Sequence, residues 1–144
     1  MDLLVDTNLL WKHSLRNRLT EQIKVGRVRA YVPTLVHAER IRQIADQKGA
    51  DFAIHVIQQL VADSRIELLP FSVEDAEAIA EVWLSLKKRD IATPEYWKAH
   101  RFDILLCAVA YARGYILVTD DQGTHFKVVA SRMNTTDLSE WLHQ

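Results

Sequence analysis

The first ten residues, MDLLVDTNLL (1–10), place a small polar group directly after an apolar run. Residues 3–5 have the length and composition of a buried strand, and Asp6-Thr7-Asn8 interrupts the apolar pattern before it resumes at Leu9. An Asp at such a junction can cap a helix. It can equally bind a ligand, because open α/β sheets hold their ligands beyond the carboxyl ends of the strands. The positions of the other acidic residues therefore decide between these two roles.

The rest of the chain alternates between short apolar runs and longer stretches with helical apolar spacing. The predicted strands after the first are residues 28–32, 66–69, 115–118 and 128–129. The predicted helices are residues 9–25, 33–48, 50–63, 72–89, 102–112 and 138–142. Ser72 and Asp75 have the spacing of a capping box, and Pro94 predicts a loop over residues 90–100. This alternation predicts an α/β fold, with a short, mostly parallel central sheet between two helical layers (α/β/α).

Composition narrows the class of protein. The chain has 144 residues, 49% of them apolar, with only three Pro and four Gly, so we expect a single domain over residues 1–144. The longest apolar run, residues 104–112, is too short to span a bilayer, and the N-terminus has no secretory pattern. The lone Cys107 cannot form an intrachain disulfide, which fits a reducing cytoplasm. We therefore expect a cytoplasmic protein without a membrane partner.

The charge is nearly balanced but unevenly distributed. A net charge of −1 argues against a nucleic-acid binder held by bulk charge. Two stretches are nevertheless basic: Lys12, Arg16, Arg18, Lys24, Arg27 and Arg29 in the first, and Lys87, Lys88, Arg89, Lys98 and Arg101 in the second. Each is either a solvated helix face or a local surface that guides phosphates.

Acidic residues recur near the predicted strand ends. Asp6 follows the first strand, Asp120 and Asp121 follow the strand at 115–118, and Asp103 begins the most apolar helix. Glu39 lies beside an apolar stripe of the helix at 33–48. Each has an ordinary explanation: a helix cap, an Asx turn or a solvated face. Taken together, they are expected near one edge of the sheet.

Converging carboxylates need a cation. Two unit charges about 4 Å apart repel by about 4 kcal/mol at an effective dielectric constant near 20. Oxygen ligands favour Mg²⁺ or Mn²⁺ over Zn²⁺, and ions held in this way activate water during phosphodiester hydrolysis. The histidines show no HxxxH or HExxH spacing, so the sequence predicts no zinc site. His37, His100 or His125 could contact a phosphate, while Tyr96 and Trp97 either stack on a base or pack in the core.

Four motifs follow one another over about 115 residues: Asp6-Thr7-Asn8, Glu39, Arg101-Phe102-Asp103-Ile104, and Val118-Thr119-Asp120-Asp121 followed by Phe126. In this order they resemble the PIN domain, and the length and layout are similar to those of VapC-type toxins of toxin–antitoxin pairs. The resemblance implies a metal-dependent endoribonuclease that uses Mg²⁺ or Mn²⁺. It also implies an RNA substrate, a cognate antitoxin and a homodimer.

Carried over by position, the acidic quartet that binds metal and catalyses hydrolysis is Asp6, Glu39, Asp103 and Asp121, with Asp120 as the alternate fourth acid. Asn8 and Thr119 match supporting polar positions. Three alternatives stay open: a PIN nuclease of RNA processing, an inactive PIN-like binding module, and a phosphoacceptor signalling domain. The last needs an Asp that closes a central strand near mid-chain, whereas Asp51 lies in a helical pattern.

Overall fold

The centre of the molecule is a five-stranded sheet. The computed structural model describes residues 1–121 and 123–144, without the side chains of residues 7, 8 and 124. The strands are β1 (Asp2–Val5), β2 (Arg29–Pro33), β3 (Glu67–Leu69), β4 (Ile116–Val118) and β5 (Arg132–Met133). Their order is β3-β2-β1-β4-β5, and all neighbouring strands pair parallel. The first strand of the chain is therefore the central one.

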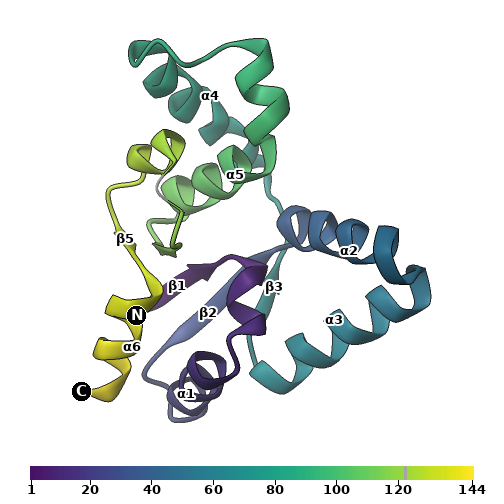
Figure 1. Cartoon of the computed structure of the whole chain (residues 1–144). Coiled ribbons are helices and arrows are strands. Elements are labelled where there is room, and N and C mark those ends of the chain that lie inside the picture. Colours follow the sequence, from purple (N-terminus) through teal and green to yellow (C-terminus); the bar gives the residue numbers. More distant parts are fainter. Residues whose placement is uncertain (122) are drawn as a thin grey trace.

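Helices cover both faces of this sheet (Figure 1). They are α1 (His13–Lys24), α2 (Thr34–Lys48), α3 (Ala50–Ser64), α4 (Val73–Lys88), α5 (Pro94–Arg113) and α6 (Thr135–His143), with 3-10 helices η1 (Thr7–Trp11) and η2 (Thr124–Val128). In Figure 1, α4 and α5 lie above the sheet, α1 and α6 lie below it, and α2 and α3 project to the right as a hairpin. None of the helices in the described part of the chain has the length and apolar character needed to cross a membrane.

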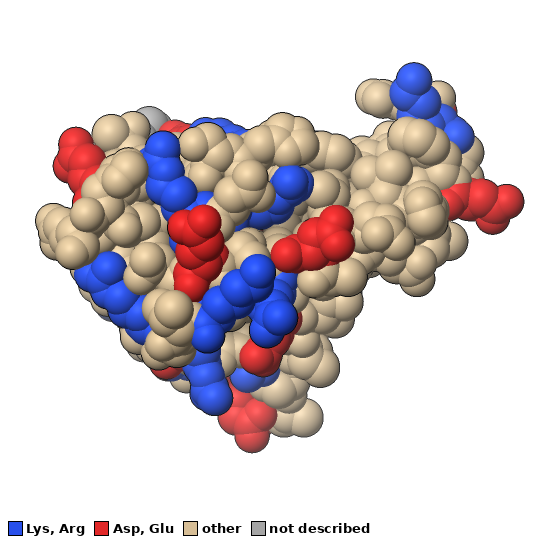
Figure 2. All heavy atoms as spheres, turned by 90° about the horizontal axis from the view of Figure 1, so that it is seen from below, with Lys and Arg blue, Asp and Glu red and all other residues tan. Residues whose placement is uncertain are grey.

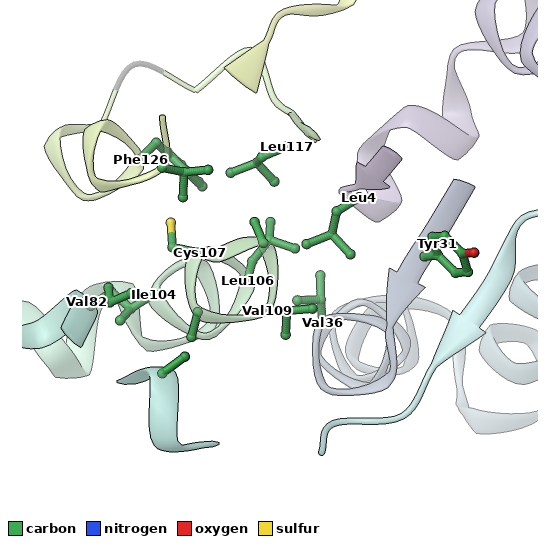
Figure 3. Close-up of a cluster of buried hydrophobic side chains, with 14 of the residues drawn as sticks. Leu4, Tyr31, Val36, Val82, Ile104, Leu106, Cys107, Val109, Leu117 and Phe126 are labelled. Carbon is green, nitrogen blue, oxygen red and sulfur yellow. The ribbon is translucent and has the colours of Figure 1, made fainter. Parts of the chain in front are cut away.

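Successive side chains of each strand point to opposite faces of the sheet, so alternate residues build an apolar layer on each face. On one face, Leu4, Tyr31 and Leu117 pack against α5, whose Leu106 and Val109 are buried (Figure 3). The opposite face belongs to a second cluster: Leu3, Val5, Ala30, Val32 and Val118 with Leu15 and Leu19 of α1 and Leu138 and Leu142 of α6. The central strands β1 and β2 are thus buried on both faces. This confirms the predicted three-layer α/β/α arrangement with a parallel sheet.

The predicted capping box at the start of α4 is present. The backbone N–H of Asp75 donates to Ser72 Oγ (3.2 Å), and the N–H of Ser72 donates to Asp75 Oδ2 (2.8 Å). Asp75 is fully buried, and Arg113 at the end of α5 donates to both of its oxygens at 3.1 and 2.8 Å. Burial alone would raise the pKa of Asp75, but the hydrogen bonds from Arg113 and Ser72 outweigh it and lower the pKa. This carboxylate ties α4 to α5.

Three local predictions are wrong. Residues 94–100 are helical rather than a loop, because Thr93 caps the helix and Pro94 occupies its first turn, where proline is tolerated. The helix predicted over 9–25 is split into η1 and α1 at Lys12. The predicted strand at 128–129 is absent, because Val128 is the last residue of η2 and Val129 follows it; the last strand is β5.

Helix α5 is not continuous. His100 has non-helical backbone angles (φ −127°, ψ 15°), so α5 consists of two helical pieces that meet there. Asp103 lies one turn beyond this kink. It therefore lies in the first turn of the second helical piece, as the sequence pattern predicted.

Candidate active site

The carboxyl end of the central strand opens into a hollow lined by acids. Asp6 directly follows β1, and it lines a hollow of about 230 Å³ together with Glu39 of α2 and Asp103 of α5. Arg40 also lines this hollow. Three of the four acids predicted for the quartet thus lie around one space, although nearly 100 residues separate the first from the last.

Two further hollows share acids with the first. One, of about 250 Å³, is lined by Asp6, Thr119, Asp120 and Asp121. The other, of about 230 Å³, is lined by Glu39 and Asp103 and by basic and imidazole side chains of α5: Lys98, His100 and Arg101. Asp6 links the first two hollows, while Glu39 and Asp103 link the first and third.

The two adjacent acids after β4 have different surroundings. Asp120 accepts hydrogen bonds from Lys12 Nζ (2.6 Å) and from the backbone N–H of Thr135 (2.8 Å). The hydrogen bonds from Lys12 and from Thr135 hold the pKa of Asp120 down at about 2. Asp120 therefore joins the end of β4 to the starts of α1 and α6.

Asp121 forms an Asx turn, which is the ordinary role that the sequence left open for it. Its Oδ1 accepts a hydrogen bond from the N–H of Gly123 at 2.7 Å, and its own N–H donates to Thr119 Oγ1 at 3.1 Å. Thr119 thus fixes the backbone that carries Asp121. The side chain of Asn8, the other supporting residue predicted, lies outside the described part of the chain.

Glu39 is held by a cation of its own helix. Arg42 donates to both carboxylate oxygens, with Nη2–Oε1 at 2.8 Å and Nε–Oε2 at 3.1 Å. These hydrogen bonds, aided by the charge of Arg42 and opposed by partial burial, lower the pKa of Glu39. Glu39 is therefore anionic and oriented, but it shares its oxygens with an arginine.

A cluster of imidazoles adjoins Asp103 and was not predicted from the sequence. His125 of η2 is 2% exposed, and its Nε2 lies 3.5 Å from Asp103 Oδ2. The ring of His100 lies 4.8 Å from that of His125, measured between centroids. His100 and His125 are 25 positions apart, so no local spacing could reveal the cluster. The available signal was only that each lies close to an acid in the sequence.

The two basic stretches of the sequence differ in what their Lys and Arg side chains contact. In the first, Lys12 binds Asp120, Arg18 donates to Ser139 of α6 (2.7 Å) and Arg27 lies over the ring of Trp141. These contacts attach α1 and its neighbours to α6. Figure 2, seen from below, shows Lys and Arg interspersed with Asp and Glu on that face rather than gathered in one basic patch. In the second stretch, Lys98 and Arg101 line an acid-containing hollow.

Two aromatic residues and the cysteine have structural roles. Trp97 packs edge-on against Trp83 of α4, with ring centroids 5.7 Å apart. Tyr96 is hydrogen bonded to His125, with 2.7 Å between Oη and Nδ1. Cys107 is fully buried in α5, and burial raises the pKa of its thiol, so it is a packing residue.

The chemistry of the site and the family comparison together identify the class of protein. Carboxylates from four segments of the chain gather at the carboxyl edge of a parallel sheet, and their oxygen donors suit a hard divalent cation such as Mg²⁺. A family model for the PIN domain matches residues 3–131. The chain therefore belongs to the PIN domain family, a family of nucleases, as its sequence motifs predicted.

Solved structures share this fold. VapBC2 from Rickettsia felis, bound to a promoter DNA fragment, aligns with a TM-score of 0.71 at 21% identity over 93% of this chain and 98% of that one. VapBC-1 from nontypeable Haemophilus influenzae aligns with a TM-score of 0.69 at 15% identity over 94% and 99%. DNA-bound VapBC from Salmonella typhimurium gives 0.66 at 16% identity over 94% and 98%. No curated protein matches the chain significantly.

Proposed function

We propose that residues 1–144 form one nuclease domain that hydrolyses RNA phosphodiester bonds with Mg²⁺ or Mn²⁺. The observation that carries the proposal is that Asp6, Glu39 and Asp103 line one hollow while Asp121 lines the next with Asp6. Carboxylates that cap helices have no reason to meet in this way. Such a cluster is stable when a divalent cation compensates the repulsion between its charges.

Asp6 and Asp103 are the central ligands in this proposal, and Glu39 and Asp121 complete the set. The bound ion supplies water activation and stabilises the charge that develops on the phosphate and the leaving 3′ oxygen. Thr119 holds the backbone of Asp121 through a 3.1 Å hydrogen bond. Asp120 stays the alternate fourth acid; the hydrogen bonds that its oxygens accept from Lys12 and Thr135 favour Asp121.

Lys98 and Arg101 are proposed to guide the RNA backbone. Both are exposed and border the hollow that contains Glu39 and Asp103. Lys and Arg that contact phosphates set the register of a nucleic acid without reading its bases. Two cations beside the acids can do this on a protein with a net charge of −1.

We further propose that the chain is the toxin of a VapBC-type pair, a cytoplasmic homodimer neutralised by a small antitoxin. The support is that three of the structures it resembles are VapBC structures, aligned over at least 93% of this chain. A PIN nuclease of RNA processing is the alternative. Growth arrest on expression, relieved by a cognate antitoxin, would distinguish the toxin from that enzyme.

The decisive experiment is cleavage of a mixed RNA pool by the purified, antitoxin-free protein in Mg²⁺, in Mn²⁺ and in EDTA. We expect cleavage with either metal, none in EDTA, and none from Asp6→Asn. The matched control is Asp2→Asn, which removes a carboxylate from the exposed start of the same strand and should cleave like the wild type. Metal-independent cleavage, or full activity of Asp6→Asn, would contradict the proposal.

If the folded protein cleaves nothing, calorimetry with Mg²⁺ and Mn²⁺ on the same sample separates the two remaining explanations. Binding that Asp6→Asn abolishes supports a selective nuclease whose target is missing from the pool. Absence of binding supports the inactive PIN-like module.

A further inference from the structure

A second set of ligand atoms meets at Asp103. His100, Asp103 and His125 each offer one nitrogen or oxygen, and these atoms all lie within 4.8 Å of one another. His100 comes from the kink of α5, Asp103 from the turn after it, and His125 from η2. The kink and η2 thus bring two imidazoles to the same carboxylate.

The ring of His125 is oriented for this purpose. Its Nδ1 lies 2.7 Å from Tyr96 Oη, and its Nε2 is buried without a hydrogen bond among the described residues. When the Nδ1–H donates to the tyrosine oxygen, the lone pair of Nε2 faces Asp103, 3.5 Å away. Histidines that bind metals are typically held through their other nitrogen in this way.

The spacing suits a small tetrahedral ion. Two ligand atoms about 2.0 Å from a tetrahedral zinc ion lie about 3.3 Å from each other. The 3.5 Å between His125 Nε2 and Asp103 Oδ2 is close to that value. The nitrogen of His100 has to approach by roughly 1.5 Å at most to complete the set, starting from separations within 4.8 Å.

We propose that Zn²⁺ binds to His100, Asp103 and His125 as a site with three protein ligands and an open fourth position. Two imidazoles and one carboxylate form a donor set that Zn²⁺ prefers and Mg²⁺ does not. Tyr96 is the positioning residue of the site, since it contacts His125 Nδ1, the nitrogen that does not bind the metal. The site is distinct in its donors from the all-oxygen set of Asp6, Glu39, Asp103 and Asp121.

Because Asp103 belongs to both sets, Zn²⁺ has a consequence that rests on the proposed nuclease function. Zn²⁺ bound by His100 and His125 withdraws a carboxylate oxygen from the all-oxygen site. Zn²⁺ therefore inhibits the Mg²⁺-dependent cleavage of RNA, because it occupies the carboxylate of Asp103 that both sets share.

The first test measures binding without RNA. Zn²⁺ is titrated into the purified full chain by calorimetry, and Co²⁺ is added separately to record the visible absorption of a tetrahedral site. We expect one Zn²⁺ per chain and a tetrahedral Co²⁺ spectrum. His100→Gln should weaken Zn²⁺ binding at least about tenfold, and Tyr96→Phe should weaken it by roughly tenfold through the freed imidazole.

Two controls separate this site from others. His55→Gln removes an exposed histidine of α3 and should bind Zn²⁺ like the wild type. Asp6→Asn should also retain Zn²⁺ binding while losing the proposed Mg²⁺ site. His100 is half-buried rather than fully buried, so His100→Gln is expected to fold. Zn²⁺ binding that is absent, or equally strong in His100→Gln and the wild type, overturns the proposal.

The second test adds Zn²⁺ to the Mg²⁺-dependent RNA cleavage assay. Inhibition in the wild type that shifts to at least about tenfold higher Zn²⁺ in His100→Gln supports the shared carboxylate. Equal inhibition of both proteins contradicts the shared carboxylate. If the chain cleaves no RNA, the nuclease proposal fails, but the calorimetric result for Zn²⁺ is unaffected.

Discussion

Two carboxylates above the sheet, Asp75 on α4 and Asp103 on α5, have opposite environments. Asp75 is fully buried, and Arg113 and Ser72 bind both of its oxygens. Asp103 is 38% exposed at its side chain and borders two hollows that also contain Glu39. A buried carboxylate with matched donors holds a fold together, whereas a half-exposed one that faces other acids suits a cation. We therefore expect substitutions of the Asp75 pair to change stability and substitutions of Asp103 to change activity.

The largest expected effect is on the activity side of this comparison. Asp103→Asn removes a charged ligand without changing shape, so the cleavage rate should fall at least about 10³-fold while the fold is retained. Circular dichroism checks the fold and RNA cleavage checks the rate. Glu95→Gln, an exposed acid at the start of the same helix, is the control and should remain active. A folded Asp103→Asn protein with full activity would remove Asp103 from the site.

The stability side is tested at Arg113. Arg113→Met leaves the buried carboxylate of Asp75 without its cation and should lower the free energy of unfolding by about 3–5 kcal/mol. Chemical denaturation at neutral pH measures this change. The double variant Asp75→Asn/Arg113→Met should lose less, because no charge is left buried. Equal losses in the single and double variants would mean that the ion pair is not what stabilises this contact.

A smaller loss of stability is expected when Asp120 is substituted. Asp120→Asn breaks the contact with Lys12, and since the Asp120 side chain is 47% exposed, solvent screening limits the loss of stability to about 1 kcal/mol. RNA cleavage should be unchanged, whereas Asp121→Asn should lose most of it. The reverse result would make Asp120 the fourth acid.

The contribution of Asp120 to stability depends on pH in a direction that can be predicted. The pKa of Asp120 is about 2 in the folded protein, below its ordinary value of 3.8. The folded state therefore binds fewer protons at this group, so its stabilisation is complete above pH 3.8 and is lost as the pH falls to about 2. Thermal unfolding over this window should show a steeper loss in the wild type than in Asp120→Asn. Parallel curves would contradict the assignment.

The smallest effect is expected at Arg42, which competes with a metal for Glu39. Arg42→Gln removes the two hydrogen bonds that Arg42 donates to Glu39 and should tighten Mg²⁺ binding by about threefold, measured by calorimetry. Asp46→Asn is the matched control, since it removes only the other ion pair of Arg42, at 2.9 Å. Equal Mg²⁺ affinity in Arg42→Gln and the wild type would show that Arg42 does not limit access to Glu39.

The sequence predicted the fold well where local chemistry is strong. Apolar runs of strand length, the capping box at Ser72 and glycine at the end of α5 all depend on neighbours in the chain, and each is confirmed by the structure. The predictions that are wrong lie where tertiary contacts decide. Pro94 fits either a loop or a first helical turn, and packing of Trp97 against Trp83 favours the helix.

By itself, the sequence determined the alternation of strands and helices and the order of the acidic motifs, because these follow from periodicity, capping and residue identity. The resemblance of these motifs to the PIN domain pointed to the family, which the family model confirms. Only the tertiary structure shows that the two neighbouring acids have different surroundings, since Lys12 and Thr135 reach Asp120 from distant parts of the chain. The same holds for the meeting of His100 and His125 at Asp103. Contacts between residues far apart along the chain depend on how the elements pack, and no local pattern records them.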